Sequence, residues 1–296
     1  MMAWLYTSLF VPFIEFGFMR RALLGALFLC LSACPVGVFL TLRRMSLMGD
    51  AMSHAILPGA AIGFLLFGLD ILPMTLGGAV AGLIVALSAG VVSRLTVQKE
   101  DAAMAAFYLI SLALGVLIVS LRGSSVDLMH VLFGTVLALG KEALLLMASV
   151  TLLSLFTLFI FWRALIAECL DPLFLRSVSR LGSRVHFLFL MLVVLNLVAG
   201  YQALGTLLSV GIMILPAVTA RFWAQRVLTM CALAVLLGII ACVSGLLFSF
   251  HLSLPSGPVI ILACGFLYLL SAAIVVLKNS HVITQILSAE WRNKRS

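Results

Sequence analysis

The sequence contains little charge. Only 9% of its 296 residues are Asp, Glu, Lys or Arg, whereas 64% are hydrophobic and the mean hydropathy is +1.29. Soluble globular domains carry about 25% charged residues, so this composition excludes an ordinary water-soluble fold. Low-complexity tracts and long polar linkers are also missing. We therefore expect one membrane-embedded domain that comprises residues 1–296.

Several catalytic and nucleotide-binding motifs are absent. The sequence contains no GxxxxGK(S/T), HExxH or GxSxG motif, so it predicts neither P-loop ATP binding nor the chemistry of zinc proteases or serine hydrolases. Its six cysteines form no CxxC pair, which predicts no disulfide framework and no zinc finger. We expect no enzyme and no resident cofactor, and any ATP would be hydrolysed by a partner.

Long apolar runs dominate the chain. Each run has about twenty residues, enough to cross roughly 30 Å of hydrocarbon as a helix. The runs predict an all-α polytopic membrane protein with eight or nine transmembrane helices, the sixth and seventh being crowded. The candidate spans are 22–42, 45–69, 71–93, 102–121, 142–162, 185–202, 204–222, 227–247 and 256–277.

The two ends are expected to lie outside the spans. Residues 1–21 combine aromatic side chains with Glu15 and predict an interfacial helix, and residues 278–296 predict a cytoplasmic tail. The alternative at the N-terminus is a lipoprotein-like signal that ends at Cys34. The apolar run continues to Arg43, however, which favours a full span.

Basic residues fall mainly in alternate loops, although the formal net charge is +8. This is the positive-inside pattern of membrane proteins rather than a nucleic-acid-binding surface. With nine spans it predicts an external N-terminus and a cytoplasmic C-terminus. The basic residues assigned to the cytoplasm are Arg43, Arg44, Arg94, Lys99, Arg163, Arg176, Arg180, Arg184, Arg221, Arg226, Lys278, Arg292, Lys294 and Arg295.

Three polar segments interrupt the apolar pattern. Residues 121–142 predict an external, partly re-entrant segment. Residues 162–186 and the turn at 220–226 are basic and predicted to be cytoplasmic. These two could hold a soluble partner or only anchor the chain to anionic lipid headgroups.

Asp50 and His54 are unexpected in an apolar span. A single Asp at the centre of a membrane helix costs about 2.5–3.5 kcal/mol on insertion scales, so it should be paired, hydrated or functional. The two residues are four positions apart and share a helix face. Counted from Arg44 at about 1.5 Å per residue, they lie roughly 9 and 15 Å into the span.

A carboxylate and an imidazole at this spacing can hold one divalent cation. Oxygen plus nitrogen suits Zn²⁺, Mn²⁺ or Fe²⁺. Two ligands bind loosely, but a two-fold dimer would bring two copies of the pair together. The structural alternative is that Asp50 caps a broken helix end and His54 bonds a neighbouring carbonyl.

Other candidate ligands are less specific. His130, beside Asp127, and His251 could guide incoming metal, but satisfied surface residues are the simpler interpretation. Cys30 and Cys34 share a helix face, which could form a soft-metal site. Small residues at a helix contact explain this pair better.

Four co-linear motifs resemble the permease subunits of bacterial zinc/manganese/iron ABC importers. They are RRMSLMGDAMSHAILPG at 43–59, VDLMHVLFG at 126–134, LGTLLSVGIMILPAVTAR at 204–221 and LPSGPVIIL at 254–262. The resemblance implies an architecture similar to cobalamin and siderophore importer permeases, in the bacterial cytoplasmic (inner) membrane. It also implies a permease homodimer, two cytoplasmic ATP-binding subunits and an extracytoplasmic metal-binding protein.

The resemblance also implies roles for particular residues. Asp50 and His54 match the family's metal-associated positions, and Ala217, Thr219, Arg221 and Arg226 fall in the segment that couples to the ATPase. The loop 168–184 would be a secondary contact. It departs from the family's D-P-E-x-A-x-x-x-G pattern at Leu173, Leu175 and Ser179.

These observations predict a permease that moves a divalent transition metal into the cytoplasm. We expect Zn²⁺ first, Mn²⁺ next and Fe²⁺ as a further possibility. The alternatives are a stand-alone proton-coupled metal transporter, because Asp and His can also relay protons, and a membrane scaffold that transports nothing.

Overall fold

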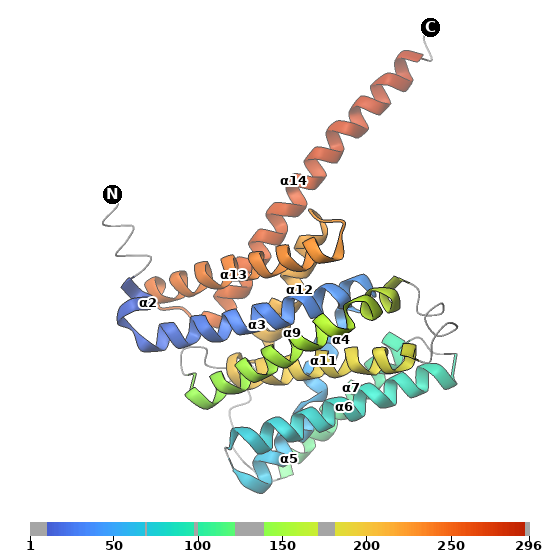
Figure 1. Cartoon of the computed structure of the whole chain (residues 1–296). Helices are drawn as coiled ribbons and strands as arrows, with labels where there is room; N and C mark the ends of the chain where they lie inside the picture. The colour runs from blue at the N-terminus through green and yellow to red at the C-terminus, as the bar shows by residue number, and fades with distance from the viewer. Residues whose placement is uncertain (1–10, 69, 98–99, 122–138, 171–180, 294–296) are drawn as a thin grey trace.

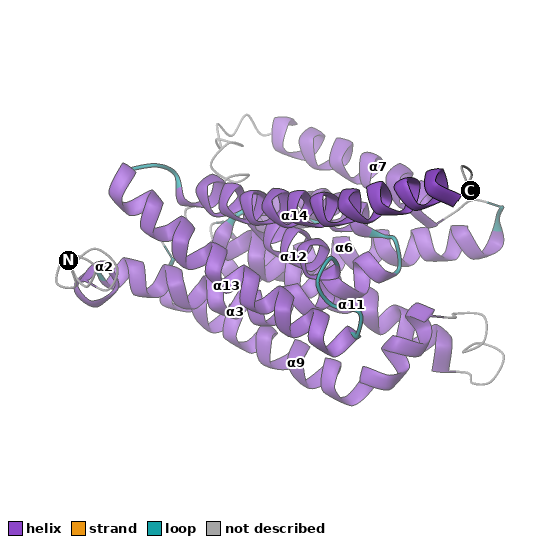
Figure 2. Ribbon diagram, turned by 90° about the horizontal axis from the view of Figure 1, so that it is seen from above, coloured by secondary structure: helices purple, strands orange, loops and turns teal. Residues whose placement is uncertain are grey.

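All regular structure in the computed structural model is helical within the residues that it describes, which are 11–68, 70–97, 100–121, 139–170 and 181–293 (Figure 2). No strand occurs in those ranges. The all-α prediction is therefore confirmed.

Within these described ranges, eight helical segments are long and apolar enough to cross a membrane. Seven are continuous helices, and one is formed by α4 and α5 together. The helices are α2 (Val11–Glu15), α3 (Gly17–Leu42), α4 (Ser46–Ala55), α5 (Leu57–Phe67), α6 (Ile71–Leu95), α7 (Glu100–Leu121), α9 (Lys141–Leu170), α11 (Leu181–Leu204), α12 (Thr206–Arg221), α13 (Val227–Leu252) and α14 (Ser256–Asn293).

The predicted span 204–222 is the short helix α12. Its 16 residues extend about 24 Å, less than the roughly 30 Å of a bilayer core. It is nevertheless central, because it packs against α3, α4, α11, α13 and α14. A Cβ at Gly37 would lie 1.7 Å from the Met213 carbonyl oxygen, so α12 and α3 touch through their backbones.

Helices α3 and α14 are longer than the predicted first and last spans. Helix α3 begins at Gly17 and includes Arg20 and Arg21, so the first span starts earlier than the predicted residue 22. Of the predicted interfacial segment, residues 1–10 lie outside the described part. At the other end the apolar part of α14, Ser256–Lys278, agrees with the predicted span 256–277, and the helix continues to Asn293 beyond the bundle (Figure 1).

The helices form a layered bundle. In Figure 1, α13, α3, α9 and α11 lie side by side, and α5 and α6 form the far edge. Aromatic side chains fill the contact between α3, α9 and α11, where the Phe39 ring lies 5.5 Å from that of Trp162 and 6.5 Å from that of Phe189. Both Phe39 and Phe189 are fully buried.

Four helix ends meet at one face of the bundle. Arg43, just after α3, has Nη2 3.4 Å from Glu168 Oε1 of α9 and Nη1 3.1 Å from His186 Nδ1 of α11. Arg221, at the end of α12, has Nη1 3.3 Å from the Thr41 carbonyl oxygen. Arg43 and Arg221 therefore lie at the same face, as expected if alternate loops are basic.

Cys30 and Cys34 lie at a close helix contact. A Cβ at Gly238 of α13 would be 3.0 Å from Cys34 Sγ and 3.1 Å from Cys30 Sγ. Cys30 Sγ is also 3.5 Å from Cys242 Sγ. The described residues contain no group of three or more His, Cys, Asp or Glu side chains that could hold a metal ion. The small-residue interpretation fits this geometry.

Helices α5 and α6 also meet backbone to backbone, and a substitution can test this contact. A Cβ at Gly77 would lie 2.2 Å from the Gly59 carbonyl oxygen, whereas a Cβ at Gly90 on the same helix would meet no atom within 4 Å. Gly77→Ala should lower the free energy of unfolding by about 1–3 kcal/mol because α5 and α6 must separate. Thermal unfolding in detergent measures the difference, with Gly90→Ala as the matched control. Equal melting temperatures for the two variants would contradict the contact.

Candidate functional site

Helices α4 and α5 form one interrupted span. The helix breaks at Ile56 because Pro58 has no N–H to donate to the His54 carbonyl oxygen four residues earlier. The Ser111 hydroxyl of α7 donates a 2.9 Å hydrogen bond to the Ala55 carbonyl oxygen at this break. Irregular backbone at membrane depth is tolerated where protein groups satisfy it in this way.

Asp50 and His54 lie in the last two turns before the break. His54 Nε2 is 3.9 Å from Asp50 Oδ1, so the predicted juxtaposition on one helix face is present. The side chain of Asp50 is 68% exposed and that of His54 is 27% exposed. His54 Nδ1 is buried and has no hydrogen-bond partner among the described residues. Both side chains therefore have capacity to bind a further group.

The opposite face of α4 fixes this orientation. A Cβ at Gly49 would lie 2.8 Å from Met213 Cε, and Met52 is fully buried. The Ser53 hydroxyl donates a 2.7 Å hydrogen bond to the Asp50 carbonyl oxygen. Helix α4 packs against α6, α7, α11 and α12, which leaves Leu47 and Asp50 on the surface of the single chain.

Asp50 does not cap a helix. Helix α4 is preceded by Met45 and α5 by Ile56, and neither N-terminus has a side-chain cap hydrogen bond in the described structure. The alternative in which Asp50 caps a broken helix end therefore does not account for the carboxylate.

Two residues of α7 complete the wall of the site. The ring of Tyr108 lies 6.3 Å from that of His54, centroid to centroid, and Ser111 supports the helix break. Neither was identified from the sequence, because α7 is far from α4 along the chain. The only available signal was a hydroxyl-bearing residue within an apolar span.

The side chains of Asp50 and His54 can coordinate the same metal ion. Metal–nitrogen and metal–oxygen bonds are each about 2.1 Å, so two ligand atoms 3.9 Å apart can contact the same cation. The described residues supply no third ligand to this pair. Within the described part of the chain, the pair therefore offers two ligands to an ion.

The predicted coupling residues divide into two groups. Ala217 and Thr219 are buried, and the Thr219 hydroxyl bonds the Leu215 carbonyl oxygen of its own helix at 2.7 Å. Arg221 and Arg226 are exposed at the two ends of the turn after α12. A soluble partner can therefore reach the turn but not the side chains of Ala217 and Thr219.

The turn also presents two aromatic side chains. Phe222 and Trp223 are exposed large hydrophobic residues that the sequence analysis did not single out. The ring centroid of Phe222 lies 5.7 Å from that of Tyr268 on α14. The accessible surface of this segment therefore combines two cations with two aromatic rings.

Among the remaining candidates, those that the structure describes add no ligand to the site. His130 and Asp127 lie outside the described residues, as do residues 171–180 of the loop 168–184. His251 is exposed in the last turn of α13, and its Nδ1 lies 2.9 Å from the Leu247 carbonyl oxygen of the same helix.

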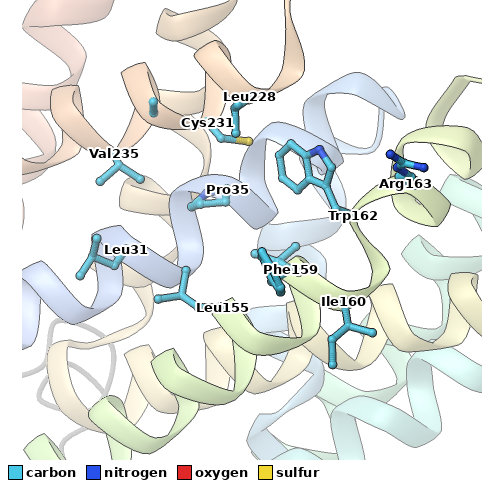
Figure 3. Close-up of a pocket in the computed structure, with 12 residues that line it drawn as sticks. Leu31, Pro35, Leu155, Phe159, Ile160, Trp162, Arg163, Leu228, Cys231 and Val235 are labelled. Carbon is cyan, nitrogen blue, oxygen red and sulfur yellow. The ribbon is translucent and has the colours of Figure 1, made fainter.

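A separate groove between α3, α9 and α13 is apolar (Figure 3). Its volume is about 960 Å³, and its lining includes Leu31, Phe159 and Leu228, with Trp162 and Arg163 at one end. No carboxylate or imidazole lines it. The groove therefore lacks the ligands of a divalent-metal site, and the candidate site lies on α4.

Comparisons with known proteins agree on one family. Residues 15–275 match the ABC 3 transport family. The chain is 33% identical over 291 residues to the manganese transport system membrane protein MntC of Halalkalibacterium halodurans, which covers 98% of this chain and 96% of that protein. It is 30% identical over 258 residues to the chelated iron transport system membrane protein YfeD of Yersinia pestis, covering 87% and 85% of the two chains. A solved structure of PsaBC from Streptococcus pneumoniae in complex with Fab is similar with a TM-score of 0.79 and 33% identity, covering 92% of this chain and 95% of that chain.

The support that α7 gives to the helix break can be tested. Ser111→Ala removes the hydrogen bond to the Ala55 carbonyl oxygen and should lower the free energy of unfolding by about 1 kcal/mol. Ser149→Ala is the control, because the Ser149 hydroxyl is exposed and bonds only the Leu146 carbonyl oxygen of its own helix. Thermal unfolding in detergent compares the two variants. A larger loss from Ser149→Ala would contradict the role of Ser111.

Proposed function

The chain belongs to the ABC 3 transport family, and from this premise we propose that it is the membrane permease of an importer that moves manganese into the cytoplasm. The relatives are named as membrane and permease proteins of metal transport systems. Because the chain has no P-loop motif, ATP is bound and hydrolysed by partner subunits.

The exposed carboxylate of Asp50 carries the proposal. Asp50 lies on the surface of the single chain within a span in which His54 is the one other ionisable residue, and hydrocarbon cannot hydrate a carboxylate. A second permease packed against this face would replace lipid with protein and a water-lined path. The carboxylate would then face the path of the ion.

A two-fold pair of permeases would complete the ligand set. Each copy contributes one carboxylate and one imidazole, so two copies supply four donors around the axis. The site in one chain is incomplete, which suits a conduit, because a permanently closed four-ligand cage would retain its cargo. The break at Ile56 gives α4 a point about which this opening could occur.

Manganese replaces zinc as the proposed cargo. From the sequence Zn²⁺ was expected first, but these relatives do not support a zinc preference, because they are named for manganese and chelated iron. Carboxylate oxygen and imidazole nitrogen are compatible with Mn²⁺ and Fe²⁺. Thiolate, which would favour Zn²⁺ or Cu⁺, is absent from the exposed face of α4.

We place the face that carries Arg43, Arg221 and Arg226 in the cytoplasm. The three cations lie at ends of helices that meet at one side of the bundle, and the positive-inside rule assigns such a side to the cytoplasm of a bacterial inner membrane. The turn from Arg221 to Arg226 would then contact the ATPase. An extracytoplasmic binding protein would deliver the ion at the opposite face.

Transport by the Asp50–His54 pair has a direct test. Asp50→Ala and His54→Ala should each lower Mn²⁺ uptake by proteoliposomes about 10- to 100-fold, because each removes one ligand per chain. The measurement uses the permease with its ATPase and binding protein. Asp70→Ala is the control, because Asp70 is an exposed acid at the start of α6 that makes no side-chain cap bond.

Three outcomes of this assay would contradict the proposal. Normal Mn²⁺ uptake by both Asp50→Ala and His54→Ala would show that these residues do not bind the transported ion. Uptake by the isolated chain in a pH gradient would favour a proton-coupled transporter. No uptake of Mn²⁺, Fe²⁺ or Zn²⁺ by the complete complex would favour a membrane scaffold.

The contact between the turn and the ATPase is testable by co-purification. Trp223→Ala removes an exposed aromatic side chain and should weaken ATPase binding by about 2 kcal/mol, roughly 30-fold. Arg226→Glu should weaken binding in the same direction. Arg20→Gln, exposed near the start of α3, is the control at the opposite face. Unchanged binding in both turn variants would place the ATPase elsewhere.

A further inference from the structure

A buried charged cluster lies beside the start of α4. It consists of Arg43 after α3, Glu168 in the last turn of α9 and His186 in the second turn of α11, with side chains that are 7%, 1% and 4% exposed. Arg43 Nη2 is 3.4 Å from Glu168 Oε1, and Arg43 Nη1 is 3.1 Å from His186 Nδ1. The cluster therefore ties three helices together at one point.

The guanidinium of Arg43 contacts partners from two other helices. Because the guanidinium can only donate, His186 Nδ1 must accept, which places the proton of the neutral ring on Nε2. The guanidinium carbon also lies 4.4 Å from the centroid of the Phe189 ring. A buried ion pair adds little net stability over apolar packing, so stability alone is a weak reason for this arrangement.

The cluster is adjacent to the α3–α4 hinge, which is the turn of residues 43–45 between these two helices. Arg43 is the residue after α3, Arg44 follows with φ of 61°, and α4 begins at Ser46. A positive φ is rare for a residue other than glycine, and it fixes the change of direction between α3 and α4. The side chain of Arg44 is exposed, so packing of that side chain does not impose this conformation.

Helix α12 contacts both sides of the same hinge. Before the hinge, Arg221 at the end of α12 lies 3.3 Å from the Thr41 carbonyl oxygen. After the hinge, Gly49 packs against the side chain of Met213 in α12. The exposed turn that follows α12 is therefore connected to the helix that carries Asp50 and His54.

We infer that Arg43, Glu168 and His186 are positioning residues that hold the end of α3 fixed, so that α4 turns about Arg44 and reorients Asp50 and His54 when the ATPase-facing turn moves α12. The inference rests on the proposed function. Packed elements joined by a hydrogen-bonded network can transmit such a movement when they have two arrangements. The backbone of α4 would turn at Arg44. The buried cluster would keep the end of α3 in place.

The decisive readout is the number of Mn²⁺ ions imported per ATP hydrolysed by the reconstituted complex. Glu168→Gln keeps the shape of the side chain but removes the charge that holds Arg43. The variant should still hydrolyse ATP, with the number of ions per ATP lowered about tenfold. Arg163→Gln is the control, because it removes an exposed charge from the same helix outside the cluster.

A pair of substitutions at Arg44 tests the hinge without altering the buried cluster. Asn adopts positive φ readily, whereas Val does so only with strain. Arg44→Asn should retain the normal ratio of ions to ATP, and Arg44→Val should lower it about tenfold. Because Arg44 is exposed, these variants remain informative if Glu168→Gln fails to fold.

The outcomes separate this inference from the proposed function. If the unmodified complex imports no Mn²⁺, the proposed function fails. If the unmodified complex imports Mn²⁺ but the ratio is normal in Glu168→Gln and Arg44→Val, the inference alone is overturned. A parallel loss of hydrolysis and uptake in a folded Glu168→Gln complex would also overturn it, because it would indicate a purely structural role.

Discussion

Hydrocarbon offers no hydrogen bonds, and this constraint governs both the backbone and the side chains of the protein. Backbone polar groups are satisfied within helices, and the break at Ile56 is supported by the Ser111 hydroxyl. Buried charges at the end of α3 are paired, as in the contact of Arg43 with Glu168. Asp50 is the exception, because it lies on the surface of the single chain. The described residues do not complete its environment, and the proposed second permease and passing ion would do so.

Properties that follow from composition and local spacing could be predicted from the sequence. Apolar length identified the spanning helices, and a separation of four residues placed Asp50 and His54 on one face of α4. The alternation of basic loops agreed with the meeting of several helix ends at one side. The helices and the Asp50–His54 juxtaposition could be predicted because each depends on residues close together in the chain.

Properties that depend on distant helices could not be predicted. Nothing in the residues around Arg43 indicated contact with Glu168 and His186, which lie on α9 and α11. The motif that contains Ala217 was assigned to coupling without knowledge of which helix face is buried, and the structure places that side chain inside the bundle. The short length of α12 could not be predicted, because apolar residues continue on the N-terminal side of this helix in the sequence.

The backbone contact between α5 and α6 determines which part of the span is stationary. With only glycine at Gly59 and Gly77, no flexible side chain separates the two helices, and sliding would bring a carbonyl oxygen against the opposite backbone. We therefore expect α5 and α6 to keep their relative positions. If α4 reorients as we propose, the change is confined to the ten residues of α4 before Ile56 and does not involve the whole transmembrane span.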